Sequence, residues 1–408
     1  MALIVQKFGG TSVADLERIR HAADKVIAAR NAGHQVVVVL SAMSGETNRL
    51  LAMGQQMAAQ PDSREMDQLA ATGEQVTIAL MAIHLSGRGY PAVSLQGWQV
   101  PIATNAVHGK ARIEQIDSEH LRRLLNDGKI VVVAGFQGVS AEGNITTLGR
   151  GGSDTTAVAL AAALNADECQ IFTDVDGVYT TDPRMVPEAH RLDSITFKEM
   201  LELASQGSKV LQTRSVEFAG KYRVPLRVLS TFVDGPGTLI SVEQGMEAPL
   251  VSGVACSRQE AWISVAQMPD TPFSASRVFG TLARAHIEVD MITQTPNAHQ
   301  RTDFSFSVSR TDVTQAISVL AGALPELPAE AISVNNDVAK VSVIGVALRS
   351  HPELVMKLFD ALAAEQIRLL AITTSESRIS VLVPDTETER SVRTLHRAFG
   401  LSVAVRAE

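Results

Sequence analysis

The feature that most constrains the fold is an alternation, over about the first 240 residues, of short apolar runs and segments with helical periodicity. Helical periodicity is clearest over 13–32 and 194–206. Strands that are continuously apolar need cover on both faces. The pattern therefore predicts an α/β fold in which helices sandwich a largely parallel sheet. The apolar runs lie at 2–6, 35–41, 91–96, 129–135, 169–175 and 225–231.

A different pattern follows the turn at 235–237 and the polar stretch 243–249, which we interpret as a linker. The apolar run 261–266 matches 339–344, and the helical positions Phe279 and Leu282 match Phe359 and Leu362. Two β-α-β-β units of this size are each small for independent stability, so we expect them to pack together. Such a duplication is typical either of a module that only dimerises or of a pair of small-molecule sensing domains.

Composition excludes several classes of protein. A net charge of −8 and the lack of a basic stripe argue against a nucleic-acid partner. No apolar run approaches the roughly 18 residues that a membrane span needs, so no membrane partner is expected. The N-terminus resembles a strand rather than a signal peptide. Cys169 and Cys256 are far apart and form no CxxC pair, so neither a metal site nor a disulfide framework is predicted. These features favour a cytoplasmic protein.

The segment 146–157 holds three glycines, Gly149, Gly151 and Gly152, just before an Ala-rich run that predicts a helix. Ser153 and Asp154 are suitable N-cap residues for that helix. The free N–H groups of a helix start attract anions, and Arg150 adds a guanidinium that suits a carboxylate or phosphate. This loop is predicted to hold a negatively charged small molecule.

Other segments become informative only in combination, because each one alone is also typical of a polar turn or a solvated surface. Lys7 stands beside the Gly9-Gly10 turn, and Lys209 follows Gly207. Oxygen ligands for Mg²⁺ are available at Asp174 and Asp182 in the polar segment 173–184. Cations and glycine-rich loops around one cleft are the pattern of phosphoryl transfer. The residues therefore predict a kinase of a small acidic substrate.

Six segments resemble, in order along the chain, the motifs of aspartate kinases: 7–13 (KFGGTSV), 41–48 (SAMSGETN), 71–75 (ATGEQ), 147–157 (TLGRGGSDTTA), 173–184 (TDVDGVYTTDPR) and 207–211 (GSKVL). The resemblance implies a three-layer α/β/α sandwich, the amino-acid kinase fold, over residues 1–244. It also implies two α+β regulatory domains of the βαββαβ ACT type, at 250–330 and 335–408. ATP with Mg²⁺ and L-aspartate are the implied ligands, and no resident metal site is implied.

The resemblance also implies roles for individual residues. The implied catalytic residues are Lys7, Arg150 and Asp154, with Lys7 acting on the γ-phosphoryl group. The implied aspartate site consists of Ser41, Thr47, Glu74, Arg150, Gly151, Gly152, Ser153 and Asp154. The implied ATP site consists of Lys7, Phe8, Gly9, Gly10, Thr173, Asp174, Tyr179, Asp182, Arg184, Lys209 and Val210. Within this scheme Glu74 pairs with the substrate ammonium, although an isolated Glu on a helix is more often solvated.

For the regulatory half, the resemblance implies feedback inhibition by lysine, threonine or both. The implied effector residues are Asp270, Ala275, Gln294, Thr374, Ser375 and Glu376. Phe273 departs from the family pattern, because a glycine usually opens the helix start there. Met246 lies where some relatives begin a separate regulatory subunit, so both an α₂β₂ assembly and a homodimer through the ACT domains are open.

Two alternatives remain at this point. One is a related kinase of glutamate, acetylglutamate, carbamate or a nucleoside monophosphate, although such enzymes generally lack tandem ACT domains and the KFGGTS opening. The other is a catalytically inactive amino-acid sensor, which the presence of Lys7, Glu74, Arg150 and Asp154 disfavours.

Overall fold

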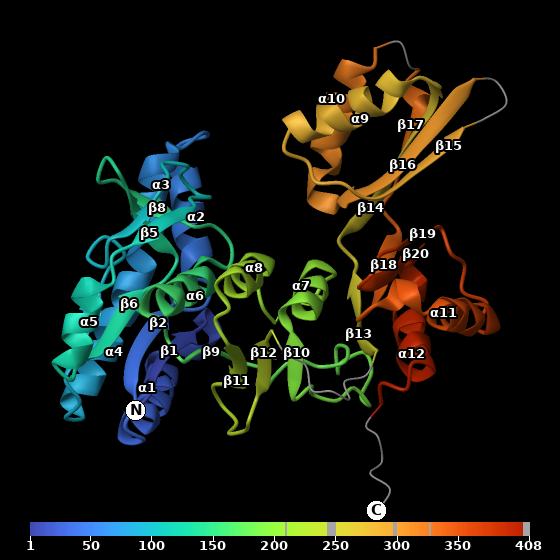
Figure 1. Ribbon diagram of the computed structural model, residues 1–408. Coiled ribbons are helices and arrows are strands. Elements are labelled where there is room, and N and C mark those ends of the chain that lie inside the picture. The colour runs from blue at the N-terminus through green and yellow to red at the C-terminus, as the bar shows by residue number, and fades with distance from the viewer. Residues whose placement is uncertain (209, 243–249, 297–299, 326–327, 403–408) are drawn as a thin grey trace, which may run out of the picture. The chain divides into compact units, whose positions relative to one another are not determined.

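The computed structural model describes residues 1–208, 210–242, 250–296, 300–325 and 328–402 (Figure 1). Lys209 and Met246 therefore lie outside the described residues. The chain forms two compact units. The first consists of Met1–Tyr179, Arg191–Ser205 and Lys209–Ala248, and the second of Thr180–His190, Gln206–Ser208 and Pro249–Glu408.

An eight-stranded sheet forms the centre of the first unit, in the order β10-β12-β11-β9-β1-β2-β6-β3. Every neighbouring pair is parallel except β11 and β12, so the predicted, largely parallel sheet is confirmed. The predicted helix 194–206 begins instead as a short strand, β10, and becomes helical only at α7 (Phe197–Ser205). The strands are β1 (Leu3–Phe8), β2 (Gln35–Leu40), β3 (Ala92–Leu95), β6 (Ile130–Ala134), β9 (Glu168–Thr173), β10 (Ser194–Thr196), β11 (Leu226–Ser230) and β12 (Thr238–Ser241).

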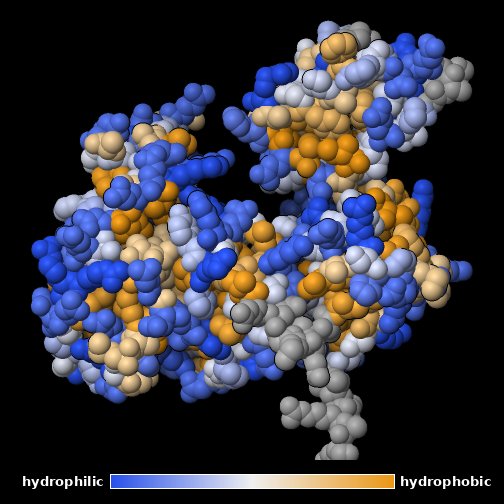
Figure 2. Space-filling view, in the orientation of Figure 1, coloured by the Kyte–Doolittle hydropathy of each residue, from blue (hydrophilic) through white to orange (hydrophobic). Residues whose placement is uncertain are grey.

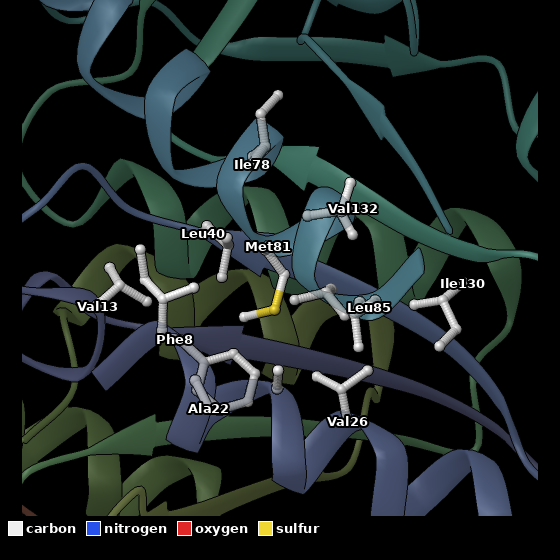
Figure 3. Close-up of a cluster of buried hydrophobic side chains, with 14 of the residues drawn as sticks. Phe8, Val13, Ala22, Val26, Leu40, Ile78, Met81, Leu85, Ile130 and Val132 are labelled. Atoms are coloured by element: carbon white, nitrogen blue, oxygen red, sulfur yellow. The ribbon is translucent and has the colours of Figure 1, made fainter. Parts of the chain in front are cut away.

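Helices cover both faces of this sheet and make the three layers of the sandwich. On one face, α1 (Leu16–Asn31) and α4 (Thr72–Gly87) pack against β2. The buried hydrophobic cluster in Figure 3 lies between these two helices and the sheet. On the other face, α6 (Gly152–Leu164) packs against β1, β2 and β9, with α5 (Glu119–Asn126) and α8 (Thr213–Tyr222) beside it. Alternate residues of β2 point to opposite faces, which explains why its run of valines is buried throughout.

A second, four-stranded sheet lies in the first unit and was not predicted. Its order is β5-β4-β7-β8, and α3 (Ser63–Ala70) packs on β8 while α2 (Glu46–Met57) packs on α3. Its strands are β4 (Ile102–Thr104), β5 (Ile113–Ile116), β7 (Gln137–Ser140) and β8 (Ile145–Thr147). Strand β8 leads directly into the glycine-rich segment at 149–152.

The second unit contains the two sequence repeats, each a four-stranded sheet with two helices. The first sheet has the order β15-β16-β14-β17 and the second the order β13-β18-β20-β19. The first repeat comprises β14 (Glu260–Pro269), α9 (Pro272–Arg284), β15 (Asp290–Pro296), β16 (Arg301–Ser309), α10 (Val313–Ala323) and β17 (Ile332–Asn335). The second comprises β18 (Val338–Gly345), α11 (Pro352–Ala364), β19 (Ala371–Thr374), β20 (Arg378–Pro384) and α12 (Thr388–Ala398).

Strand β13 (Val251–Ser257) departs from the predicted organisation of the repeats. It lies within 250–330, the range expected for the first ACT domain, but it pairs with β18 in the second sheet. The first sheet is instead completed by β17, which lies beyond residue 330 and pairs with β14. The first repeat thus has the expected βαββαβ order, whereas the second takes its remaining strand from the start of the unit.

Buried charges connect the two repeats. The Lys340 ammonium on β18 lies 2.8 Å from Asp290 and 3.2 Å from Glu260, both of which belong to the first sheet. Arg378 on β20 also pairs with Asp290 at 3.3 Å. The Lys340 side chain is only 5% exposed, so loss of one partner would leave an uncompensated buried charge. The two repeats are therefore joined by specific ion pairs.

The surface carries hydrophobic residues among hydrophilic ones on both units (Figure 2). Two of them, Ile292 and Ile372, lie on the edge strands β15 and β19. Among the described residues, no helix has both the length and the apolar character that crossing a membrane requires.

Candidate active site

Several predicted residues lie at one edge of the large sheet. Strands β9, β1 and β2 are adjacent and parallel, so their carboxyl ends meet there. Lys7 is the second-last residue of β1, Ser41 directly follows β2, and Thr173 ends β9. The topology therefore brings together motifs that are separated by more than 100 positions in the sequence.

Lys7 and Asp154 form an ion pair at this edge. The Lys7 ammonium lies 2.5 Å from the Asp154 carboxylate, and both side chains are about one-tenth exposed. Asp154 is in the first turn of α6, where a carboxylate interacts favourably with the helix dipole. A cation held this way is fixed in place before any phosphate arrives.

The glycine-rich loop differs from the prediction in its helix cap. Gly151, rather than Ser153 or Asp154, is the N-cap of α6, and it has φ of +71°, a conformation that favours glycine. A Cβ at Gly151 would also lie 2.2 Å from the Gln212 side chain. Ser153 and Asp154 therefore lie inside the first helical turn, and both line the cavity described below.

Glu74 is buried, contrary to the expectation that an isolated glutamate on a helix is solvated. It is 2% exposed, and its Oε1 accepts a hydrogen bond from Ala42 N at 3.1 Å. Gly73 allows this close approach, since a Cβ there would lie 2.7 Å from the Ala42 Cβ. Oε2 has no hydrogen-bond partner among the described residues. Burial raises the pKa of Glu74 from 4.5 to about 8, because the charged form is poorly solvated.

These groups line one cavity of about 430 Å³. All of the predicted aspartate and catalytic residues contribute to it: Lys7, Ser41, Thr47, Glu74, Arg150, Gly151, Gly152, Ser153 and Asp154. Gly10, which was predicted for the nucleotide site, lines it as well. The remaining lining residues were not predicted as ligand residues: Thr11, Ala42, Met43, Ser44, Gly45, Asn48, Phe136, Gly149 and Gln212. Ser44 and Asn48 lay within a recognised motif, but nothing in the sequence distinguished them from ordinary turn residues.

Arg150 lies at the exposed side of this cavity. No hydrogen bond or ion pair among the described residues involves its guanidinium. Its five donors are therefore available to a ligand. The cavity therefore presents three features to a small molecule: the Arg150 guanidinium, the buried carboxyl group of Glu74 and the Lys7–Asp154 ion pair.

The residues predicted for the nucleotide are more dispersed. The Phe8 side chain is fully buried in the core (Figure 3), so it is not exposed to a ligand. It stacks on Phe172 with ring centroids 4.7 Å apart. Thr173 donates to Asp174 at 3.1 Å, and the Tyr179 hydroxyl donates to Asp176 at 2.9 Å. Partial burial raises the pKa of Tyr179, and the hydrogen bond to Asp176 adds to the effect.

The remaining predicted nucleotide residues are divided between the two units. Gly9 directly follows β1, and a Cβ there would lie 3.3 Å from the Lys7 ammonium. Val210 is half-buried in the first unit. Asp182 and Arg184 belong to the second unit, where they form an ion pair at 2.7 Å. In the part of the chain that the structure describes, no group of three or more His, Cys, Asp or Glu side chains is arranged to hold a metal ion.

The predicted effector residues fall into two places. Thr374 and Ser375 line a cavity of about 560 Å³ in the second repeat, together with largely apolar residues of α11. Glu376 is exposed next to them, and its carbonyl accepts a hydrogen bond from Leu348 N. In the first repeat, Ala275 is half-buried in the first turn of α9, while Asp270 and Gln294 are exposed. Phe273 is 76% exposed in the same helical turn.

Comparisons with known proteins agree with this architecture. Residues 2–230 match the model of the amino acid kinase family, and residues 263–324 and 341–399 match an ACT domain. The chain is 56% identical to an aspartokinase of Pseudomonas aeruginosa, over all of this chain and 99% of that protein.

Two solved structures of E. coli aspartokinase III are also similar to this chain, each at 29% identity over 97% of this chain and 99% of the other. One is the R-state complex with aspartate and ADP, with a TM-score of 0.82. The other is the T-state complex with lysine and aspartate, with a TM-score of 0.77.

Proposed function

The chain belongs to the aspartokinase family, and we propose that it transfers the γ-phosphoryl group of ATP to the β-carboxylate of L-aspartate. The observation that carries this proposal is the charge pattern of the 430 Å³ cavity. A buried carboxylate with an unpartnered oxygen, an exposed guanidinium and a paired ammonium line one space of the size of an amino acid beside a phosphate.

L-Aspartate complements this pattern at three points. Its α-ammonium pairs with Glu74, whose Oε2 has no other partner among the described residues. Its α-carboxylate takes the donors of Arg150, which suit a bidentate contact. The β-carboxylate then points toward Lys7 and the first turn of α6, where positive charge is concentrated. Ser41 and Thr47 supply hydroxyl groups along the same wall.

The reaction needs no general base. A carboxylate is ionised at neutral pH, so one β-carboxylate oxygen attacks the γ-phosphorus directly. The new bond joins that oxygen to phosphorus, and the bond from phosphorus to the oxygen bridging to the β-phosphate breaks. The products are 4-phospho-L-aspartate and ADP. Lys7 neutralises charge that grows on the transferring group, and Asp154 holds Lys7 in place.

We further propose that ATP binds with Mg²⁺ beside the ends of β1 and β9. Mg²⁺ is commonly held by one or two carboxylates together with substrate phosphates, so it does not require a dedicated cluster of ligands. Asp174, exposed just beyond β9, suits that role, and Gly9 and Gly10 leave room for phosphates near Lys7. Tyr179 and Val210 complete the proposed nucleotide set within the first unit.

The regulatory repeats are proposed to bind lysine, threonine or both as feedback inhibitors. The cavity beside Thr374 and Ser375 supports this proposal for the second repeat, and the ion pairs of Lys340 would transmit a change in one repeat to the other. The exposed Ile292 and Ile372 on edge strands favour a second copy of the chain as the partner of this unit.

A trapping assay tests the activity. Hydroxylamine converts an acyl phosphate into a hydroxamate, which forms a coloured complex with added Fe³⁺. The full chain is therefore incubated with MgATP, hydroxylamine and each of several acidic substrates. We expect hydroxamate with L-aspartate and little with glutamate or acetylglutamate. ATP-dependent product with one of those two, or with no substrate at all, would contradict the proposal. Repeating the assay with lysine and threonine tests inhibition.

A further inference from the structure

Asp67 is a buried carboxylate that the proposed reaction does not use. It lies on α3, outside the residues that line the 430 Å³ cavity, and its side chain is 3% exposed. No lysine or arginine of the described residues lies within ion-pair distance of it. A buried carboxylate is costly unless hydrogen bonds or a cation satisfy its oxygens, so its surroundings need an explanation.

Donors from two separate segments converge on this carboxylate. The Thr147 backbone N–H and hydroxyl donate to it at 3.1 and 2.5 Å. The Gly109 N–H donates at 3.1 Å to both oxygens, and His108 Nδ1 lies 2.7 Å from Oδ2. An ionised carboxylate only accepts, so it satisfies all these donors at once. Charge-assisted hydrogen bonds of this kind are stronger than neutral ones.

The two segments that Asp67 holds both adjoin the glycine-rich loop. Thr147 ends β8, two residues before Gly149. The carbonyl of Gly109 faces Gly149, where a Cβ would lie 3.0 Å from it. Ala111 N also donates to the Thr147 carbonyl at 2.9 Å. One carboxylate therefore holds both the strand that enters the loop and the segment on which the loop rests.

Arg214 holds the same two segments through their carbonyls. Its guanidinium donates to Leu148 O at 2.8 Å and to Ala111 O at 2.9 Å. Partial burial lowers the pKa of Arg214, with the nearby Arg112 contributing. The chain entering Gly149 is thus held by a carboxylate through its N–H groups and by a guanidinium through its carbonyl groups.

We propose that Asp67 is a positioning residue for substrate binding: it sets the place of the 149–152 loop, and thereby of Arg150, without touching the substrate. The inference rests on the proposed function, in which Arg150 binds the α-carboxylate of aspartate. Displacement of a binding group by about 1 Å costs up to roughly 100-fold in such sites. The loop carries no residue assigned to ATP, so aspartate binding is the step that Asp67 controls.

The Asp67→Asn substitution tests this idea with almost no change in volume. The amide replaces one of the two acceptor oxygens with an N–H donor and removes the negative charge, so the side chain no longer accepts charge-assisted hydrogen bonds at both positions. We expect the KM for aspartate, and the Kd measured by calorimetry, to rise at least about 10-fold while the KM for ATP changes less than about twofold. Asp62→Ala is the matched control, because Asp62 caps the same helix by accepting from Arg64 N and Glu65 N. It should lower the melting temperature and leave both KM values unchanged.

A second pair of variants keeps the carboxylate and covers the case in which Asp67→Asn does not fold. Thr147→Val removes the hydroxyl donor and should raise the KM for aspartate about threefold or more, whereas Thr147→Ser retains it and should behave like the unmodified chain. A KM for aspartate within twofold of normal in folded Asp67→Asn, or equal values for the two Thr147 variants, would overturn the inference. Failure of the unmodified chain to phosphorylate aspartate would refute the proposed function instead, before any variant is compared.

Discussion

The sharpest consequence of the site concerns the proton on Glu74. Burial raises the pKa of this carboxyl from 4.5 to about 8, which corresponds to roughly 5 kcal/mol at 1.36 kcal/mol per pKa unit. At pH 7 about 0.9 of the free protein therefore carries a proton at Glu74. A substrate ammonium next to Oε2 favours the ionised form and lowers the pKa again. Binding of L-aspartate at pH 7 should then release about 0.9 proton per site.

Calorimetry measures this release. L-Aspartate is titrated into the full chain, without ATP, in buffers of different ionisation enthalpy, and the slope of the observed enthalpy against that quantity gives the number of protons. The release should fall to about 0.1 at pH 9, where Glu74 is already ionised in the free protein. Glu74→Gln should abolish the release and weaken aspartate binding by roughly 10- to 100-fold, the scale for losing a hydrogen bond to a charged group.

Glu46→Gln serves as the control for that titration. Glu46 lies on the neighbouring α2, but it is solvated and paired with Arg49, and the hydrogen bond from Arg49 lowers its pKa. This variant should release the same number of protons as the unmodified chain. A release below about 0.2 proton at pH 7 in the unmodified chain, or an undiminished release in Glu74→Gln, would refute the reasoning about Glu74.

Three further predictions follow from the same site. Lys7→Ala should lower kcat for phosphorylation of aspartate by roughly 10²- to 10³-fold, the scale for one transition-state donor, and a near-normal kcat would remove the assigned role. Arg150→Ala should raise the KM for aspartate by roughly 10-fold or more with kcat changed only a few-fold, and an unchanged KM would place the carboxylate contact elsewhere. Glu74→Gln should also change how stability depends on pH. Between pH 4.5 and about 8, Glu74 is protonated in the folded chain and ionised in the unfolded chain. The free energy of unfolding therefore falls as the pH rises through this window. The contribution of the raised pKa to stability is complete below pH 4.5 and is lost as the pH rises through 8. Gln cannot ionise, so in denaturant titrations the free energy of unfolding of Glu74→Gln should rise relative to that of the unmodified chain as the pH increases, by up to about 1.4 kcal/mol per pH unit. Plots of the free energy of unfolding against pH that are parallel for the two proteins would contradict the raised pKa.

Local patterns predicted six of the eight strands of the large sheet, but not β10 and β12. The valine run at 36–39 is buried on both faces in the structure, as a continuously apolar strand requires. The strands of the small sheet were not predicted because each is only three or four residues long and contains polar residues, so none forms a continuous apolar run. The exchange of β13 into the second sheet also escaped notice, since it depends on pairing with a strand more than 80 positions away, which no local periodicity reports.

The site shows the same division between local and tertiary causes. Lys7, Arg150 and Asp154 were predicted from glycine-rich motifs, and all three line the cavity. Glu74 was expected on a solvated face of its helix on local grounds, because its burial depends on Gly73 packing against Ala42, which belongs to a distant loop. The Phe8 side chain is buried in the core, so its predicted place in the nucleotide site stays a prediction for its backbone alone.

The most direct test of the proposed reaction asks which carboxylate receives the phosphate. In the proposed binding mode, Glu74 and Arg150 hold the α-groups of aspartate, and only the β-carboxylate faces Lys7. The full chain is supplied with MgATP and either [4-¹³C]- or [1-¹³C]-L-aspartate, and the product is observed by ¹³C and ³¹P NMR. We predict phosphorus–carbon coupling with the 4-labelled substrate alone. Coupling with the 1-labelled substrate, or no acyl phosphate with either, would contradict the proposed binding mode and the activity derived from it.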